Sequence, residues 1–376
     1  MVPTSTVEIS ETKFRENITQ LKGLIGTGTK LMAVVKSNAY GHGTLLISKL
    51  AQKYGADYLG VNSIEEAILI RENKINLPIL ILGYVPLKDI KYVAEYDFEV
   101  VMYNKENIEK LQRESEKINK KSKIHLKIET GTNRQGIFPE KLEEMLNFLS
   151  TKKNIELKGI YTHFANIEDT TNHSYAMKQL ENFKKAINIT NNRHLIFHTA
   201  CSAATILFPE THFSMVRTGI SLYGLWPSRE TFISAKEKKL NIKLKPILKW
   251  KSIIAQIKEI PEGSFIGYGC TYKANRKLKI GIVPVGYFEG YPRALSNKSY
   301  VIVNGKRAQI LGRICMNMMI VDLTEIENVK IEDEVVLIGK MGKEEITADY
   351  LANLSNTINY EIVTRISPHI PRILIS

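Results

Sequence analysis

From residue 31 to residue 219, short apolar runs alternate with longer stretches in which apolar residues recur every three or four positions. Short apolar runs are typical of buried strands, and the longer spacing is typical of amphipathic helices. Eight runs are predicted to be strands: 31–36, 57–62, 78–83, 98–103, 124–129, 157–164, 194–199 and 214–219. Eight alternating β and α units predict an α/β fold with a closed (β/α)8 barrel of the TIM type, and an open doubly wound sheet is the alternative.

After residue 239 the pattern changes to β-rich segments joined by glycine turns. The Asn304-Gly305 pair between two apolar runs predicts a tight hairpin. A helix is expected over 347–356 and a last strand over 359–367. This part of the chain therefore predicts a mainly antiparallel β domain.

We expect two domains, a barrel over 1–238 and a β domain over 239–376, and residues 1–10 could pair with either. Hydrophobic residues make up 44% of the chain, and no segment approaches the ~18 apolar residues of a membrane span. The first ten residues show no secretory signal, and three cysteines without CxxC spacing argue against a disulfide framework. These features predict a cytoplasmic protein that does not enter a membrane.

The formal net charge of +13 raises the possibility of nucleic-acid binding. The lysines are mixed with glutamates along helical stretches such as 105–123, and no stretch alternates basic and aromatic residues. A solvated basic surface is the better interpretation, so no nucleic-acid partner is expected.

Candidate chemistry lies where the predicted strands end, because barrel active sites form at the carboxyl ends of the strands. Lys36 ends the first predicted strand, after the apolar run from Met32 to Val35. Desolvation that lowers the pKa of such a lysine makes its amine nucleophilic, and Schiff-base chemistry is the natural use. The alternative is a lysine that simply extends to water.

The loops after the seventh and eighth predicted strands contain Ser202, Gly219 and Ile220, and Arg217 lies in the eighth strand. Barrels often hold a phosphate on these two loops, although a single glycine or serine is equally typical of an ordinary turn. Together with Lys36, these groups predict pyridoxal phosphate, whose ring nitrogen needs a protein partner.

With these residues the sequence closely resembles the alanine racemases, which are fold-type III pyridoxal phosphate enzymes. The segment AVVKSNAYGHG (33–43) is similar to the cofactor-lysine motif of that family. Other segments match in the same order along nearly the whole chain: ETGTNRQG, YTHFA, HTACSAAT, MVRTGISLYG, GYGCTY, GRICMN and TINYEIVTRIS.

The resemblance implies a cytoplasmic isomerase that interconverts L- and D-alanine and supplies D-alanine for peptidoglycan. It also implies a homodimer with shared active sites. A serine or broad-specificity amino-acid racemase is the alternative within the same family.

The resemblance further implies roles for individual residues. Lys36 and Tyr268 would be the two acid–base groups, with Tyr268 supplied by the β domain of a partner subunit. Arg217 would hydrogen-bond the pyridine nitrogen. His163 would link Arg217 to Tyr268, and Arg134 would orient Tyr268 and the substrate carboxylate. The residues implied to bind the cofactor phosphate are Tyr40, Ser202, Gly219, Ile220 and Tyr360.

Met316 of the partner subunit is implied to meet the substrate carboxylate through its N–H group. Tyr161, Tyr287 and Arg293 resemble the residues that line the entrance, and Tyr287 is expected among the substrate-binding residues.

Physical chemistry supports the two-base arrangement. Racemisation removes a proton from one face of Cα and returns one to the other face, so two bases on opposite sides suffice. Free tyrosine ionises near pH ~10, so Tyr268 needs positive charge nearby. We expect His163, Arg217 and Arg134 to supply it. Arg217 donates only and stays charged, so it would disfavour ring protonation and limit transamination.

Lys127 and Glu129 lie two residues apart on the fifth predicted strand and share a face with His125. The family often carries a carbamylated lysine at the position of Lys127, and a carbamate would neutralise Arg134. A plain Lys127–Glu129 salt bridge is the alternative.

Four residues depart from the common family pattern and bear on substrate preference: Cys201, Thr132, Asn133 and Asn317.

Other classes of protein fit the sequence less well. His194 and His198 are four apart, but no HEXXH glutamate lies between them, so no metal is expected. Pyridoxal phosphate carrier proteins lack the second domain. Fold-type III decarboxylases resemble the 33–43 segment poorly.

Overall fold

The computed structural model describes residues 3–190 and 194–376, and the chain divides into two compact units. The first unit comprises 13–39 and 44–245, and the second comprises the residues up to Thr12, 40–43 and 246–376. The domain limits 1–238 and 239–376 stay a prediction. The strand β1 (Ser5–Ser10) pairs with strands of the second unit.

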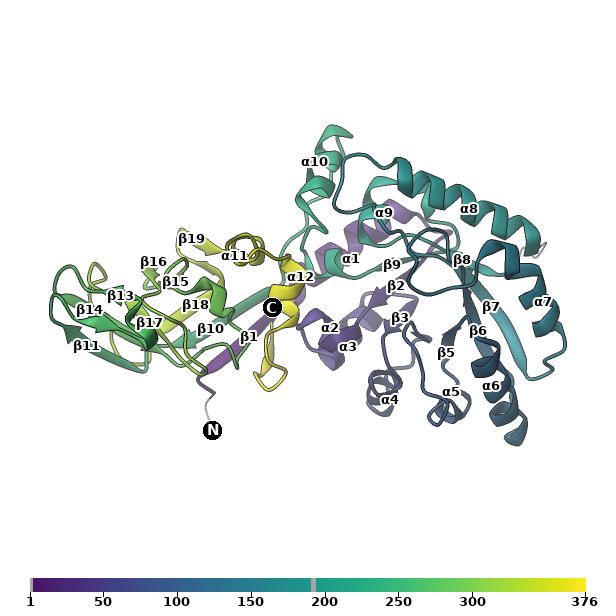
Figure 1. Cartoon of the computed structure of the whole chain (residues 1–376), viewed down its shortest axis with the longest axis horizontal. Coiled ribbons are helices and arrows are strands. Elements are labelled where there is room, and N and C mark those ends of the chain that lie inside the picture. Colours follow the sequence, from purple (N-terminus) through teal and green to yellow (C-terminus); the bar gives the residue numbers. More distant parts are fainter. Residues whose placement is uncertain (1–2, 191–193) are drawn as a thin grey trace. The chain divides into compact units, whose positions relative to one another are not determined.

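Eight parallel strands form the centre of the first unit, with helices around them (Figure 1). They are β2 (Lys30–Val34), β3 (Tyr58–Val61), β4 (Ile79–Ile81), β5 (Glu99–Met102), β6 (Ser122–Lys127), β7 (Ile155–Tyr161), β8 (Ile196–His198) and β9 (Met215–Thr218). The sheet order is β8-β7-β6-β5-β4-β3-β2-β9. Ser214 N donates to Phe197 O at 3.0 Å and Arg217 N donates to Ala200 O at 2.9 Å, which nearly closes the barrel between β8 and β9. The predicted barrel architecture is confirmed.

The connecting helices follow the strands as the alternating pattern predicts, except that α1 precedes β2 and that the residues of α2 after Lys36 have left-handed φ. They are α1 (Glu11–Ile25), α2 (Lys36–Tyr40), α3 (Thr44–Lys53), α4 (Ile64–Glu72), α5 (Lys91–Glu95), α6 (Lys105–Lys117), α7 (Leu142–Ser150), α8 (Ser174–Thr190), α9 (Ser202–Leu207) and α10 (Arg229–Glu237), with 3-10 turns η1 (Pro139–Lys141), η2 (Pro209–Thr211) and η3 (Ile220–Tyr223). Hydroxyl side chains cap the N-termini of some of these helices. Ser228 Oγ, for example, accepts from Thr231 N at 2.9 Å at the start of α10.

The strands of the barrel are buried on both faces, and every residue of β3, β4 and β5 is buried. Parallel strands covered in this way are normally apolar throughout. The barrel core nevertheless contains buried acidic, basic and imidazole side chains on its strands, among them Glu99, His125, Lys127, His198 and Arg217. Burial of such groups is unfavourable unless they are paired, so they mark the functional part of the barrel.

The second unit is mainly antiparallel. Its largest sheet has the order β16-β15-β18-β10-β1-β20 with β19 on β18, and β11-β14-β17 and β12-β13 form smaller sheets. The strands are β10 (Leu248–Ile253), β11 (Gln256–Ile260), β12 (Phe265–Ile266), β13 (Tyr272–Lys273), β14 (Leu278–Val283), β15 (Tyr300–Val303), β16 (Lys306–Gln309), β17 (Met319–Asp322), β18 (Glu334–Met341), β19 (Glu344–Ile346) and β20 (Arg372–Ile375). The remaining elements are α11 (Ala348–Ser355), α12 (Asn359–Thr364), η4 (Tyr268–Cys270) and η5 (Arg293–Leu295).

The predicted hairpin at Asn304 and Gly305 is confirmed, because β15 and β16 pair on either side of it and both residues have positive φ, 49° and 72°. The helix predicted over 347–356 is α11.

The strand predicted over 359–367 is wrong, because residues 359–364 form the helix α12. Its buried residues Asn359, Ile362 and Val363 have the i, i+3, i+4 spacing of one helix face. The β-branched residues suggested a strand, and burial of this face prevails over that propensity. The last strand, β20, comes later in the chain and pairs with β1.

Candidate active site

Lys36 follows β2 and begins a left-handed turn. Strand β2 ends at Val34, two residues earlier than predicted. Ser37, Asn38, Ala39 and Tyr40 then have φ of 55°, 55°, 50° and 54°. Left-handed conformations cost L-residues roughly 1–2 kcal/mol each, so four in succession persist only where neighbouring groups hold them. Such strain is typical of functional sites.

Glu66 on α4 is the main group that holds this turn. Its Oε1 accepts from Ser37 N at 2.5 Å, and its Oε2 accepts from Asn62 N at 2.8 Å. Ala39 N also donates to Val35 O at 3.0 Å. The carboxylate of Glu66 therefore ties the backbone next to Lys36 to the end of β3.

The environment of Lys36 favours its neutral amine. Burial lowers the pKa of Lys36 and the charge of Arg134 lowers it further, while Glu66 opposes them. A lysine whose pKa is lowered in this way has a larger fraction of nucleophilic amine at neutral pH.

Arg217 on β9 is 5% exposed, and its guanidinium is held by acceptors on neighbouring strands. Nη1 donates to His198 Nδ1 at 2.9 Å, and Nη2 donates to the carbonyls of Thr162 and Thr199, each at 2.9 Å. Among the described residues these bonds use only the two terminal nitrogens, so Nε is the donor that remains for a ligand.

His163 lies 3.3 Å from Arg217, measured from Nδ1 to Nη2. Burial, and then the charge of Arg217, lower the pKa of His163 well below its usual value. His163 is therefore neutral at pH 7. A neutral His163 would not supply the positive charge that we expected from it, which leaves Arg217 and Arg134 as the expected sources.

The two loops expected to hold a phosphate meet within the first unit. Ser202 Oγ accepts from Gly219 N at 3.1 Å and from Ser221 N at 3.4 Å, and Ile220 begins η3 between them. Ser221 Oγ is buried and has no hydrogen-bond partner in the part of the chain that the structure describes. A buried hydroxyl without a partner beside backbone N–H groups fits an anionic ligand.

Tyr40 and Tyr360, the two tyrosines expected at the phosphate, lie together in the second unit. Their ring centroids are 6.0 Å apart and the rings are tilted by 48°.

Lys127 is 4% exposed, and its Nζ donates to Gln135 Oε1 at 3.1 Å. Glu129 uses both carboxylate oxygens on backbone N–H groups, those of Gly131, Thr132 and Arg134. These contacts do not support the Lys127–Glu129 salt bridge. Burial, then the charges of Arg134 and Arg217, lower the pKa of Lys127 to about 8.

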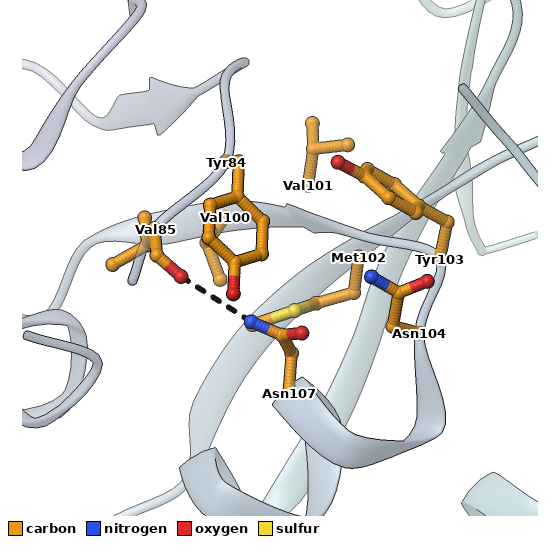
Figure 2. Close-up of a pocket in the computed structure, with 8 residues that line it drawn as sticks. All are labelled: Tyr84, Val85, Val100, Val101, Met102, Tyr103, Asn104 and Asn107. Carbon is orange, nitrogen blue, oxygen red and sulfur yellow. Dashed lines mark hydrogen bonds between the residues drawn. The ribbon is translucent and has the colours of Figure 1, made fainter. Parts of the chain in front are cut away.

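Gln135 also donates to Tyr103 Oη at 3.1 Å, at the end of β5. Figure 2 shows the small pocket beside this tyrosine, where Asn107 Nδ2 donates to Val85 O at 3.2 Å. None of the residues predicted for the site lines this pocket.

Tyr161 was expected at the entrance, but it is 3% exposed and lies in the barrel core. Its ring stacks on His198 with centroids 4.8 Å apart and an interplanar angle of 7°. The guanidinium of Arg217 lies over the same ring, 5.0 Å from its centroid. Tyr161 therefore packs against the group that fixes Arg217.

Tyr268 lies in the second unit on a short turn, η4, and is 70% exposed. Gly267 and Gly269 on either side have φ of 75° and 71°. A side chain at Gly269 would place its Cβ 2.7 Å from the guanidinium of Arg313, so the turn packs closely on the loop that precedes Met316.

Met316 and Tyr287 lie on two loops that are bonded to each other in the second unit. Tyr287 N donates to Cys315 O at 3.1 Å, and Phe288 N donates to Met316 O at 2.9 Å. Met316 is 54% exposed and Tyr287 is 43% exposed. Tyr268, Met316 and Tyr287 are thus all exposed on the second unit.

Sequence analysis missed Glu66, which bonds to Ser37 N, and Glu99, which bonds to His125. The alternation of side chains along a strand predicted that His125 and Lys127 share a face. His198 was considered only as a metal ligand. Among the described residues, no group of three or more His, Cys, Asp or Glu side chains could hold a metal ion.

Known family models match both parts of the chain. The family model for the N-terminal domain of alanine racemase matches residues 9–227, and the model for its C-terminal domain matches 247–374. The chain is 43% identical to an alanine racemase of Leptospira interrogans, over 99% of this chain and 96% of that relative. It is 39% identical to an alanine racemase of Methanococcus maripaludis, over 97% of each chain.

Solved structures agree with these matches. The alanine racemase of Bacillus anthracis with bound L-Ala-P has a TM-score of 0.93 and 35% identity, covering 100% of this chain and 96% of that one. The alanine racemase of Clostridium difficile 630 has a TM-score of 0.93 and 33% identity with the same coverage. The chain belongs to the alanine racemase family. None of its described helices combines the length and apolar character needed to cross a membrane.

Proposed function

We propose that this chain racemises alanine with pyridoxal phosphate as cofactor, using Lys36 of one subunit and Tyr268 of a partner subunit as the two bases. The observation that carries the proposal is Lys36, a lysine of lowered pKa on a strained turn at the end of β2 in a chain of this family. The product D-alanine would serve peptidoglycan synthesis in the cytoplasm.

The residues fit pyridoxal phosphate in three respects. Lys36 offers a nucleophilic amine for the aldehyde, and Arg217 keeps Nε for the ring nitrogen. Ser202, with the backbone at Gly219 and Ile220, forms a cradle for the phosphate, beside the buried hydroxyl of Ser221 that lacks a protein partner. Tyr40 and Tyr360 would complete the phosphate site. When bound, the cofactor supplies the electron withdrawal that acidifies the Cα proton of an amino acid.

The chain's own residues would then move the protons. Lys36 would accept or return the Cα proton on one face, and Tyr268 on the other. The positive charges of Arg217 and Arg134 would favour the ionised form of Tyr268. Neutral His163 would connect Arg217 to Tyr268 by accepting a hydrogen bond and donating one.

Arg134 would also orient the substrate carboxylate, with the N–H of Met316 and the side chain of Tyr287 at the substrate. Arg217 is held by carbonyls and a histidine, and no carboxylate among the described residues contacts it directly. It would therefore disfavour ring protonation and so protect the reaction from transamination.

A homodimer follows from the same proposal. Tyr268 and Met316 are exposed on the second unit of the single chain, and a partner subunit would bury them. An exposed tyrosine on a glycine-bounded turn is well suited to enter another subunit's site.

The test is to supply purified, cofactor-loaded protein with L-alanine, L-serine and other L-amino acids and to follow enantiomer ratios by chiral chromatography. Alanine should racemise fastest. Lys36→Ala should abolish the reaction, while Lys49→Ala, at an exposed lysine on α3, should leave it unchanged. Faster turnover of serine would establish the serine racemase alternative, and no racemisation of any amino acid would refute the proposal.

A further inference from the structure

Four buried side chains, joined in a row by hydrogen bonds, cross the barrel core. Arg217 Nη1 lies 2.9 Å from His198 Nδ1, His198 Nε2 lies 2.9 Å from His125 Nδ1, and His125 Nε2 lies 2.8 Å from Glu99 Oε2. Tyr58 Oη donates to the other oxygen of Glu99 at 3.3 Å. These side chains come from β9, β8, β6, β5 and β3. The hydrogen-bonded row therefore crosses the barrel from β9 and β8 to β5 and β3.

Arg217 and Glu99 stand at the two ends of this hydrogen-bonded row of side chains. Their donor and acceptor properties fix the position of every proton in the row. Arginine only donates, so His198 Nδ1 must accept and His198 Nε2 must carry hydrogen. His125 Nδ1 then accepts, and His125 Nε2 donates to Glu99. An ionised carboxylate accepts only, which agrees with this direction from the opposite end. Both imidazoles are therefore neutral and held in one tautomer.

Burial supports the same assignment. His125 and His198 are fully buried, and Glu99 and Arg217 are each 5% exposed. Burial and the charge of Arg217 lower the pKa of His198 well below its usual value, so it stays neutral at pH 7. Among the described residues, hydrogen bonds connect Arg217 through His198 and His125 to the carboxylate of Glu99.

The backbone leaves space for this arrangement at Gly159 in the middle of β7. A Cβ at this position would lie 2.4 Å from His125 Nδ1 and 2.6 Å from Ile196 O. Glycine weakens a strand interior, so its use here fits a requirement for the close approach of the His125 ring.

Barrel cores are normally filled by branched apolar side chains. A polar network in that place destabilises the core if any member lacks a partner, and it gives a unique arrangement when all are satisfied. Arg217 is the cationic end of this network, so a fully satisfied network can fix the position of its guanidinium.

We propose that Glu99 and His125 are positioning residues for Arg217. The carboxylate of Glu99, through the fixed tautomers of His125 and His198, keeps an acceptor facing Nη1 and so holds the guanidinium in the orientation that leaves Nε for the cofactor ring. This inference rests on the proposed function, because it assumes that Arg217 faces the pyridine nitrogen.

Three variants test the network. Glu99→Leu removes the acceptor, so His125 can donate from Nδ1 to His198 Nε2, and His198 then presents a protonated Nδ1 to Arg217. Glu99→Gln keeps an oxygen acceptor of the same size and is the matched control. Gly159→Ala leaves Glu99 intact but displaces the His125 ring.

The first readout is the 15N spectrum of ring-labelled histidine in the protein without cofactor. The wild type and Glu99→Gln should show His198 and His125 each as the Nε2–H tautomer. Glu99→Leu and Gly159→Ala should lose that pattern. A wild-type pattern in folded Glu99→Leu or in Gly159→Ala would overturn the inference, so either variant decides if the other does not fold.

The second readout is the ratio of pyruvate release to racemisation with alanine and loaded enzyme. Glu99→Leu should raise this ratio at least tenfold, and Glu99→Gln should change it by less than threefold. A merely structural role would lower both rates together and leave the ratio unchanged.

Arg217→Gln separates the inference from the proposed function. If this variant raises the ratio and Glu99→Leu does not, the inference is wrong and the role of Arg217 stands. If Arg217→Gln leaves the ratio unchanged, the assigned role of Arg217 itself is wrong.

Discussion

Replacing Lys127 with methionine should raise the free energy of unfolding at pH 7. Lys127 is 4% exposed and its ammonium faces the charges of Arg134 and Arg217. The fall of its pKa from 10.5 to about 8 corresponds to about 3 kcal/mol of destabilisation of the charged form. Methionine fills similar space without charge but loses the hydrogen bond to Gln135, which offsets about 1 kcal/mol. The net gain should be about 2 kcal/mol.

The gain should depend on pH in a defined direction. Below pH 8 the lysine is protonated in both the folded and unfolded wild type, so the full destabilisation is present. Between about pH 8 and 10.5 the unfolded chain binds more protons than the folded one, so wild-type stability rises with pH. The gain in unfolding free energy of Lys127→Met over the wild type should therefore decrease between about pH 8 and 10.5.

Urea denaturation in CO2-free buffer, at pH 7 and pH 10 and at one protein concentration, measures this difference. Lys123→Met is the matched control on the same strand, because Lys123 is 30% exposed in its side chain and pairs with Asp97. That variant should lose no more than about 1 kcal/mol. A Lys127→Met protein that is less stable than wild type at pH 7, or equally favoured at both pH values, would refute the reasoning.

Bicarbonate separates the two states considered for Lys127. A carbamate forms from the neutral amine and replaces a positive charge by a negative one beside Arg134. Added bicarbonate should then stabilise the wild type and leave Lys127→Met unchanged. An equal response of the two proteins would exclude the carbamate.

Three further outcomes are expected. Glu66→Ala, which frees the N–H groups of Ser37 and Asn62, should weaken cofactor binding by about tenfold in a fluorescence titration, the equivalent of one hydrogen bond to a charged group; unchanged affinity would remove Glu66 from the site. Borohydride reduction of the loaded protein followed by peptide mapping should label Lys36, and a label on another lysine would contradict its assignment. Inactive Lys36→Ala and Tyr268→Phe proteins, refolded together, should regain part of the activity through hybrid dimers; no recovery despite subunit exchange would place both bases in one chain.

The barrel was predictable because its signal is repeated. Each of the eight apolar runs is short, but eight of them in alternation with helical spacing leave few other folds. Strand parity also correctly placed His125 and Lys127 on one face of β6. The failures are local. The segment 359–367 has β-branched residues, and only the packing of Ile362 and Val363 reveals its helical face.

The site could be predicted as a set of residues but not as an arrangement. Four consecutive positive φ values from Ser37 to Tyr40 have little propensity signal, because none of these residues is glycine and only Asn38 is of a type that favours positive φ. Glu66 is 29 residues from Ser37, and Glu99 is 26 residues from His125. Both contacts depend on which strands lie side by side in the barrel, β2 with β3 and β5 with β6. The neutral state of His163 depends on burial and on the charge of Arg217, which only the structure provides.

Solvent deuterium incorporation at Cα tests the two-base assignment most directly. Loaded wild type, Lys36→Ala and Tyr268→Phe are incubated in D2O with L-alanine or D-alanine, and exchange is followed separately for each enantiomer. Tyr268→Phe keeps the ring but loses the ionisable oxygen, so exchange from L-alanine should slow by about 10² or more. Exchange from D-alanine should fall much less, because Lys36 acts on that face. Equal loss from both enantiomers in Tyr268→Phe would contradict distinct bases on opposite faces and favour a single base that serves both.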